Sequence, residues 1–65
     1  MTLFQIQQAV KAGKTVHWAS TAYQVEVDNL GQWFIHCTLN DHYIGLTHRD
    51  GITLNGKEEE FFIGG

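Results

Sequence analysis

Five side chains in this sequence have the chemistry of zinc ligands, because imidazole and thiolate are the groups that zinc usually binds. They are His17, His36, Cys37, His42 and His48. In the strand register derived below, His42 and His48 share the inner face but lie about 20 Å apart at ~3.3 Å per residue. His17 and His36 point to the outer face. Three ligands do not converge, so we predict no metal site and no cofactor.

Catalytic pairs are equally poorly supported by the spacing. A nucleophilic Cys37 would need a histidine beside it, and its neighbour His36 points to the opposite face of the same strand. Glu26 and Asp28 could form an acid–base pair, whereas the glutamates at 58–60 have the pattern of solvated surface. A domain this small also has little room for a deep pocket. We therefore predict no catalytic residue and no enzymatic activity.

The composition bounds the partners and the location. The net charge is −3 and only four residues are Lys or Arg, which argues against binding to a phosphate backbone. A protein partner is expected instead. No apolar run is long enough to span a membrane, and polar residues interrupt the N-terminal segment, so a cytoplasmic location is expected. A single cysteine cannot form an internal disulfide, and oligomerisation is one alternative source of stability for a small domain.

The first element is an amphipathic helix over about residues 2–12. Thr2 and Gln5 have the spacing of a capping box, and Gly13 follows as a C-terminal stop. Leu3, Ile6 and Val10 recur at helical spacing. A helix of three turns is stable only when its apolar stripe packs on another element, and the predicted sheet is the available one.

From residue 14 the apolar period changes to two, which is typical of strands. A turn at Ser20 and Thr21 would place Val16 opposite Val25. The segment 28–31 (DNLG) has the order of a type I turn with a bulge at its glycine, and it would place Val25 opposite Ile35.

Two further turns follow. A two-residue turn at Asn40 and Asp41 would pair Cys37 with Ile44. The segment 48–51 (HRDG) repeats the chemistry of the first type I turn and would pair Leu46 with Leu54. The apolar segment 61–63 (FFI) is expected to form a short last strand that pairs along an edge or closes a barrel.

These elements predict one domain over residues 1–65, of class α+β and mostly β. A short N-terminal helix precedes strands at about 14–63. Five or six short strands in antiparallel meander order, with one apolar face and one covering helix, favour a small SH3-like barrel because closure protects the sheet edges.

The outward-facing positions of the strands form the candidate partner-binding surface. They are Gln24, Glu26, Phe34, His36 and Tyr43, with Thr38 and Thr47 beside them. Two aromatic residues on a solvent-facing sheet surface need something to cover them. A partner is one possibility, and the N-terminal helix is the alternative. Phe61 and Phe62 are a second candidate, for edge-to-edge pairing between subunits. A protein interface or homodimer is therefore expected.

Two resemblances add functional expectations. Gly64-Gly65 resembles the tail of ubiquitin-like sulfur carriers, although those proteins carry their helix centrally and the match covers two residues; a flexible end is the alternative. Over nearly the whole chain, the segments 16–18 (VHW), 23–25 (YQV), 44–47 (IGLT) and 54–56 (LNG), with Phe61-Phe62, resemble small uncharacterised proteins of phages, plasmids and integron cassettes. That resemblance implies an accessory protein of a mobile genetic element that binds or inhibits a host factor.

The function expected from these observations is a non-enzymatic protein-binding module of a mobile element that contacts its partner through the outward aromatic surface. One alternative is a small barrel that binds single-stranded nucleic acid by stacking bases on Phe34 and Tyr43. A sulfur carrier is the other alternative.

Overall fold

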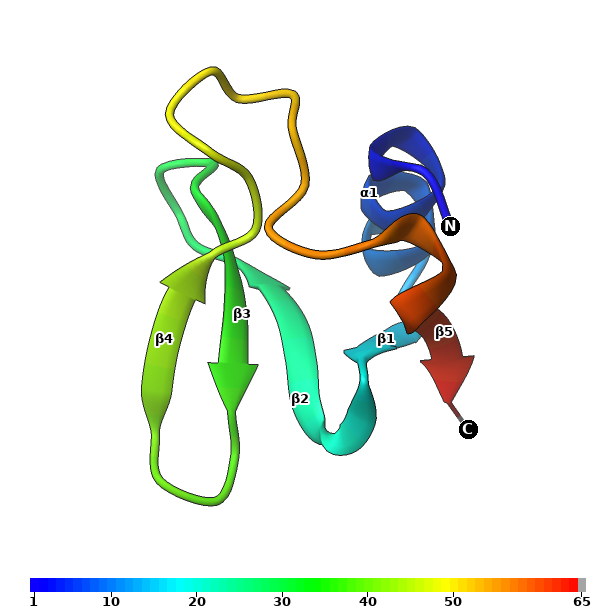
Figure 1. Cartoon of the computed structure of the whole chain (residues 1–65), viewed down its shortest axis with the longest axis vertical. Coiled ribbons are helices and arrows are strands. Elements are labelled where there is room, and N and C mark those ends of the chain that lie inside the picture. The colour runs from blue at the N-terminus through cyan, green and yellow to red at the C-terminus, as the bar shows by residue number, and fades with distance from the viewer. Residues whose placement is uncertain (65) are drawn as a thin grey trace.

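The computed structural model describes residues 1–64, so Gly65 of the Gly64-Gly65 pair lies outside the described residues. Its elements follow one another as α1 (Leu3–Lys11), β1 (Thr15–Trp18), β2 (Ser20–Val27), β3 (Trp33–Cys37), β4 (His42–Gly45), the 3-10 helix η1 (Glu58–Glu60) and β5 (Phe61–Gly64). The five strands form one antiparallel sheet in the order β4-β3-β2-β1-β5 (Figure 1). The predicted class is confirmed: a small α+β fold that is mostly β.

Helix α1 begins and ends where its capping residues indicate. The Thr2 hydroxyl accepts a hydrogen bond from the Gln5 amide at 3.1 Å, and the Gln5 side chain accepts one from the Thr2 amide at 2.9 Å. These two bonds satisfy amide groups that the first helical turn leaves without partners. Gly13 follows the helix with φ of 86°, a left-handed conformation that glycine adopts without strain.

The first hairpin keeps the predicted register only as far as His17, because the register shifts between His17 and Trp18. His17 lies opposite Gln24, which is the register that places Val16 opposite Val25. The chain reverses at Ala19, which has φ of 64° and donates its amide to the Glu60 carbonyl at 2.9 Å. Ser20 is therefore already in β2, opposite Trp18, and the predicted turn at Ser20 and Thr21 is wrong.

The second hairpin is as predicted. Val25 lies opposite Ile35 and Val27 opposite Trp33, and Gly31 has φ of 79°. The Asp28 carboxylate holds the turn through one oxygen, Oδ1, which accepts the amides of Leu30 at 2.9 Å and Gln32 at 2.8 Å. An aspartate at the first position of a turn commonly makes such bonds.

The β3–β4 hairpin differs from the predicted register by two residues. Cys37 pairs with His42 and Ile35 with Ile44, because a four-residue loop at 38–41 replaces the predicted two-residue turn. Thr38 leaves the β3–β4 ladder and bonds to the Ala22 carbonyl instead, through both its amide at 2.8 Å and its hydroxyl at 2.9 Å. A shift of two residues leaves every side chain on its predicted face, since strand side chains alternate with period two.

Beyond β4 the predicted strand pairing is wrong. Thr47 bridges Leu54 in an isolated contact, one residue out of the predicted register, and Ile52 is 74% exposed. Asp50 explains the loop, because its carboxylate accepts the amides of Ile52 and Thr53, both at 2.9 Å, and also the Thr53 hydroxyl. These bonds curl the segment into turns and leave it unable to extend as a strand.

Strand β5 forms where predicted but pairs with β1, with Val16 opposite Ile63 and His17 opposite Phe62. The order is thus a meander for β1 to β4 only. Strands β4 and β5 are the two edges of an open sheet, so closure into an SH3-like barrel is not confirmed.

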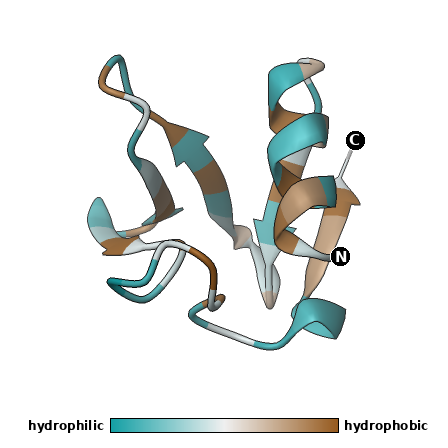
Figure 2. Cartoon of the chain, turned by 90° about the horizontal axis from the view of Figure 1, so that it is seen from above, coloured by the Kyte–Doolittle hydropathy of each residue, from teal (hydrophilic) through white to brown (hydrophobic). Residues whose placement is uncertain are grey.

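The core lies between α1 and the inner face of the sheet. Its buried members are Ile6, Ala9, Val16, Val25, Ile35, Leu46 and Phe61. Figure 2 shows that the apolar stretches belong to α1 and the strands while the connecting turns are largely hydrophilic. The helix therefore packs on the inner face of the sheet, and not on the face that carries the outward aromatic residues. Among residues 1–64, α1 and the other helical segment are too short to cross a membrane.

Candidate functional site on the outer face

The register of β2, β3 and β4 brings the predicted surface residues together. Gln24, His36 and Tyr43 are cross-strand neighbours in one row, and Glu26, Phe34 and Gly45 are neighbours in the next. We call the surface formed by Gln24, Glu26, Phe34, His36 and Tyr43 the outer face. Because Val25 and Ile35 point into the core beneath α1, these alternating residues point away from it. The sequence prediction of one contiguous surface agrees with this placement.

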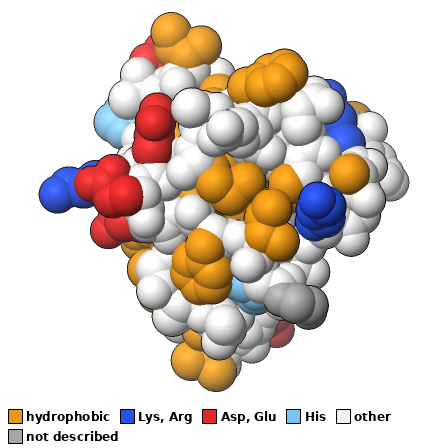
Figure 3. All heavy atoms as spheres, turned by 90° about the vertical axis from the view of Figure 1, so that its right-hand side faces the viewer, with side chains coloured by type: hydrophobic (Ala, Val, Ile, Leu, Met, Phe, Trp, Pro, Cys, Tyr) orange, Lys and Arg blue, Asp and Glu red, His pale blue; other side chains and the backbone are white. Residues whose placement is uncertain are grey.

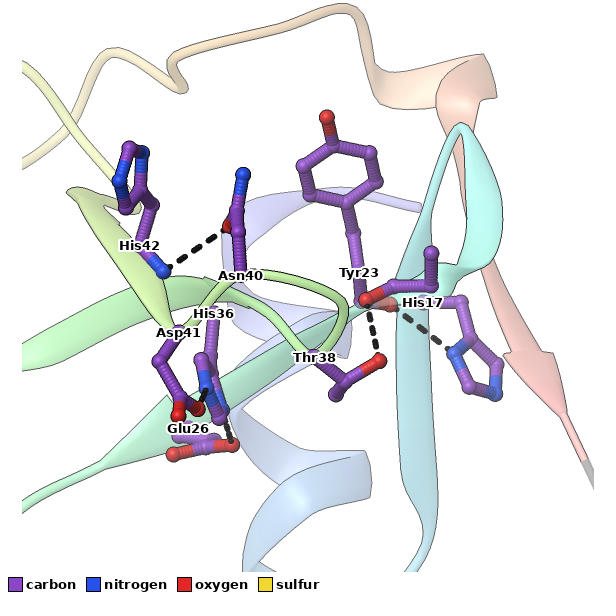
Figure 4. Close-up of polar contacts among 9 residues, drawn as sticks. His17, Tyr23, Glu26, His36, Thr38, Asn40, Asp41 and His42 are labelled. Atoms are coloured by element: carbon purple, nitrogen blue, oxygen red, sulfur yellow. Dashed lines mark hydrogen bonds and ion pairs between the residues drawn. The ribbon is translucent and has the colours of Figure 1, made fainter.

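His36 is the centre of the outer face because both of its ring nitrogens meet a carboxylate. Nδ1 lies 2.6 Å from Glu26 Oε2 and Nε2 lies 2.9 Å from Asp41 Oδ1 (Figure 4). Only the protonated ring can donate to both, so this arrangement favours the imidazolium ion. Asp41 was not predicted as a site residue, and the sequence identified it only as part of the predicted turn. In the structure it adopts φ of 56°.

The electrostatics of His36 follow from these two contacts. The hydrogen bonds to Glu26 and then Asp41 raise the pKa of His36 above its ordinary value of 6.5, against a smaller opposing effect of desolvation. The side chain of His36 is 14% exposed, whereas that of Asp41 is 85% exposed. The outer face therefore holds an imidazole between two carboxylates that favour its protonated form, and one of these carboxylates lies at the rim of the face.

Two aromatic rings complete the outer face. The Tyr43 ring stacks on the His36 ring with centroids 4.3 Å apart and planes only 4° from parallel. Phe34 meets Tyr43 edge to face, with centroids 6.1 Å apart and planes at 83°. Such pairs add stabilisation beyond simple burial. Tyr43 is nevertheless 55% exposed, so a large aromatic surface is held in place and faces solvent.

A groove of about 300 Å³ opens beside these rings. It is lined by Glu26, Val27, Asp28, Phe34 and Tyr43, and we call it the acidic notch. Gly45, the cross-strand partner of Phe34, adds no side chain to this part of the sheet. The notch combines aromatic walls with two carboxylate-bearing residues, a chemistry suited to a cation.

Phe61 and Phe62, the second predicted contact site, do not act together. Phe61 is 3% exposed and belongs to the core, so its prediction as a partner-binding residue is wrong. Phe62 points away from the core because strand residues alternate between the two faces. Phe62 is 38% exposed, and the centroid of its ring lies 5.4 Å from that of the His17 ring. His17 lies opposite Gln24, so Phe62 and His17 continue the row of the outer face toward β5.

The register places Cys37 opposite His42, a pairing that the predicted two-residue turn had missed. Cys37 is buried, and Figure 4 shows His42 and Tyr23 on the other side of the sheet from the Glu26–His36–Asp41 cluster. Over residues 1–64, groups of three or more His, Cys, Asp and Glu side chains arranged to hold a metal ion are not found.

A second groove, of about 690 Å³, lies between α1 and β5. Hydrophobic side chains gather on this side of the molecule (Figure 3), where Phe4 is 69% and Ile63 50% exposed. Lys14 also lines the groove, and acidic side chains do not. The groove thus offers apolar contact at a free sheet edge, with no arrangement of groups for chemistry.

Comparison with known proteins gives no match to a family model, a curated protein or a solved structure. The resemblances to mobile-element proteins and to sulfur carriers stay predictions.

Proposed function

We propose that this protein is a small, non-enzymatic binding module that contacts a protein partner through its outer face. The observation that carries the proposal is the stack of Tyr43 on a histidine fixed by two carboxylates, which leaves a large aromatic ring over half exposed. Rigid aromatic side chains bind partners at low cost in conformational entropy and are enriched at interface hot spots. An accessory or inhibitory role toward a host factor belongs to the same proposal.

A capture experiment with matched variants tests it. Tagged wild-type protein, Tyr43→Ala and Leu39→Ala serve as baits; Leu39 is 83% exposed in the turn that follows β3 and serves as a control for losing exposed apolar surface. A partner recovered by the wild type is purified, and its affinity for each bait is measured by calorimetry. We expect Tyr43→Ala to weaken binding at least about tenfold, as hot-spot residues do. Equal affinity for all three baits would contradict the proposal.

Single-stranded nucleic acid is the second candidate ligand, and exposure of Tyr43 is the observation in its favour. Glu26 and Asp28 line the groove beside that ring with negative charge, which repels phosphates. Fluorescence titration with oligonucleotides at low salt separates the two candidates. We expect no binding, and saturable binding that Tyr43→Ala removes would favour the nucleic-acid function.

A further inference from the structure

The acidic notch has the charge of a cation site, and within residues 1–64 no lysine or arginine pairs with its carboxylates. Glu26 and Asp28 bring two negative charges to the notch, and a protonated His36 bonded to Glu26 offsets one of them, so negative charge remains in excess. The notch is thus electrostatically complementary to a basic group from outside the chain.

The two carboxylates of the notch are held in place by bonds that leave acceptor positions open. Glu26 uses Oε2 for His36, and Asp28 uses Oδ1 for the amides of Leu30 and Gln32. Among residues 1–64, these hydrogen bonds leave Glu26 Oε1 and Asp28 Oδ2 without a donor. Carboxylates fixed in this way bind a cationic donor with less loss of side-chain entropy than free ones do.

The aromatic walls specify which cation fits. Phe34 and Tyr43 meet edge to face, so their ring surfaces are turned at nearly a right angle beside the carboxylates. A planar guanidinium can lie against an aromatic ring and donate hydrogen bonds in its own plane to a carboxylate at the same time. A lysine ammonium is more strongly hydrated and lacks that planar fork.

We infer that the acidic notch accepts the guanidinium of an arginine side chain presented by the protein partner, with Glu26 and Asp28 as acceptors and Phe34 and Tyr43 as walls. This inference rests on the proposed function and names the chemistry of the partner's contact residue.

Three blocked tripeptides serve as probes: acetyl-Gly-Arg-Gly-amide, its lysine counterpart, and its citrulline counterpart, which keeps the shape of arginine and removes the charge. Each is titrated into the ¹⁵N-labelled full chain and followed by amide NMR signals. We expect the arginine peptide to shift the signals of Glu26, Asp28, Phe34 and Tyr43, the lysine peptide to bind more weakly, and the citrulline peptide to cause no saturable shift.

Two variants with the same change in charge locate the site. Asp28→Asn keeps an Oδ1 acceptor for the turn, so the fold is retained, and it should weaken arginine binding about two- to fivefold. Glu59→Gln, on η1, should leave the affinity unchanged. The inference is overturned if citrulline or lysine binds as well as arginine, if the shifts map elsewhere, or if both variants weaken binding equally.

The outcomes separate this inference from the proposed function. A partner that depends on Tyr43 but binds Asp28→Asn normally, together with silent arginine titrations, would refute the arginine contact and leave the binding module intact. Arginine binding in the notch, combined with a partner that is indifferent to Tyr43→Ala, would refute the proposed use of the outer face and leave the notch chemistry intact.

Discussion

His36 connects three strands of the outer face through its side chain alone. It bonds to Glu26 of β2 and to Asp41 just before β4, and Tyr43 of β4 stacks on its ring. Each contact is partly exposed and individually weak, but together they fix the ring orientation on which the aromatic surface depends. The outer face is therefore ordered by polar groups, while its aromatic residues remain available for contact.

At this residue scale, the raised pKa of His36 predicts a pH dependence of stability. Because the folded-state pKa lies above the unfolded value, the protonated ring contributes stability that is fully present below about pH 6.5 and is lost as the pH rises through the folded-state pKa. Thermal unfolding measured between pH 6 and 9 should show a falling melting temperature.

The Glu26→Gln variant is the control for that prediction, since the bond to Glu26 is the largest cause of the raised pKa. NMR titration of the His36 ring should give a lower pKa in this variant than in the wild type, and the melting temperature should depend less on pH. A wild-type His36 that titrates at or below 6.5 would show that the two carboxylate contacts do not persist in solution.

At the scale of single elements, strand β5 depends on the absence of a side chain at Gly64. A Cβ built at this position would overlap the ring of His17, which is only 7% exposed. Gly64→Ala should therefore force β5 away from β1 and lower the free energy of unfolding by about 1–3 kcal/mol, the usual cost of overpacking. Urea denaturation measures this loss.

The double variant His17→Ala/Gly64→Ala tests the cause of that loss. Removing the imidazole removes the overlap, so Gly64→Ala should cost much less in the His17→Ala background than in the wild type. Equal costs in both backgrounds would mean that the strain comes from the backbone and not from His17.

The loop between β4 and η1 depends on Asp50 in a similar way. Hydrogen bonds from the Thr53 side chain and from the amides of Thr53 and Ile52 lower the pKa of Asp50 to about 2. Because the folded-state pKa lies below the unfolded value of 3.8, the stability that Asp50 contributes is present above about pH 4 and is lost as the pH falls toward 2.

Asp50→Ala should abolish that acid-dependent loss and increase amide hydrogen exchange at Ile52 and Thr53, whose bonds it removes. The neighbouring Arg49→Ala provides a control, since Arg49 takes no part in the hydrogen bonds of the Asp50 carboxylate. Unchanged exchange in Asp50→Ala would mean that the loop is held by its other bonds, such as the His48 amide to the Thr53 carbonyl at 2.7 Å.

For the whole molecule, the open sheet makes self-association the feature to measure. The chain of 7.4 kDa has edges at β4 and β5, and exposed edges pair readily with other strands. The homodimer expected from the sequence should appear as twice the chain mass in light scattering coupled to size exclusion. The Ile63 side chain is half exposed on the edge strand β5. Ile63→Lys places a charge on that edge and should therefore give the monomer mass. A wild-type monomer at all concentrations would contradict the dimer.

The local chemistry of the chain was sufficient to predict helix α1 and strands β1 to β4. The Thr2–Gln5 capping box, the left-handed Gly31 and Gly51, and the alternation of apolar residues depend on neighbours a few positions away, and each is found in the structure. Alternation also assigned Phe34, His36 and Tyr43 to one face, and a register error of two residues in β4 could not undo that assignment.

Tertiary structure decided what depends on distant contacts. The pairing of β5 with β1, the burial of Phe61 and the position of α1 on the inner face are set by which arrangement fills one core, and local pattern does not encode this choice. The site shows the same division. Strand alternation assigned Glu26 and His36 to one surface, but the contact of His36 with the second carboxylate, Asp41 of the loop at 38–41, was found only in the tertiary structure.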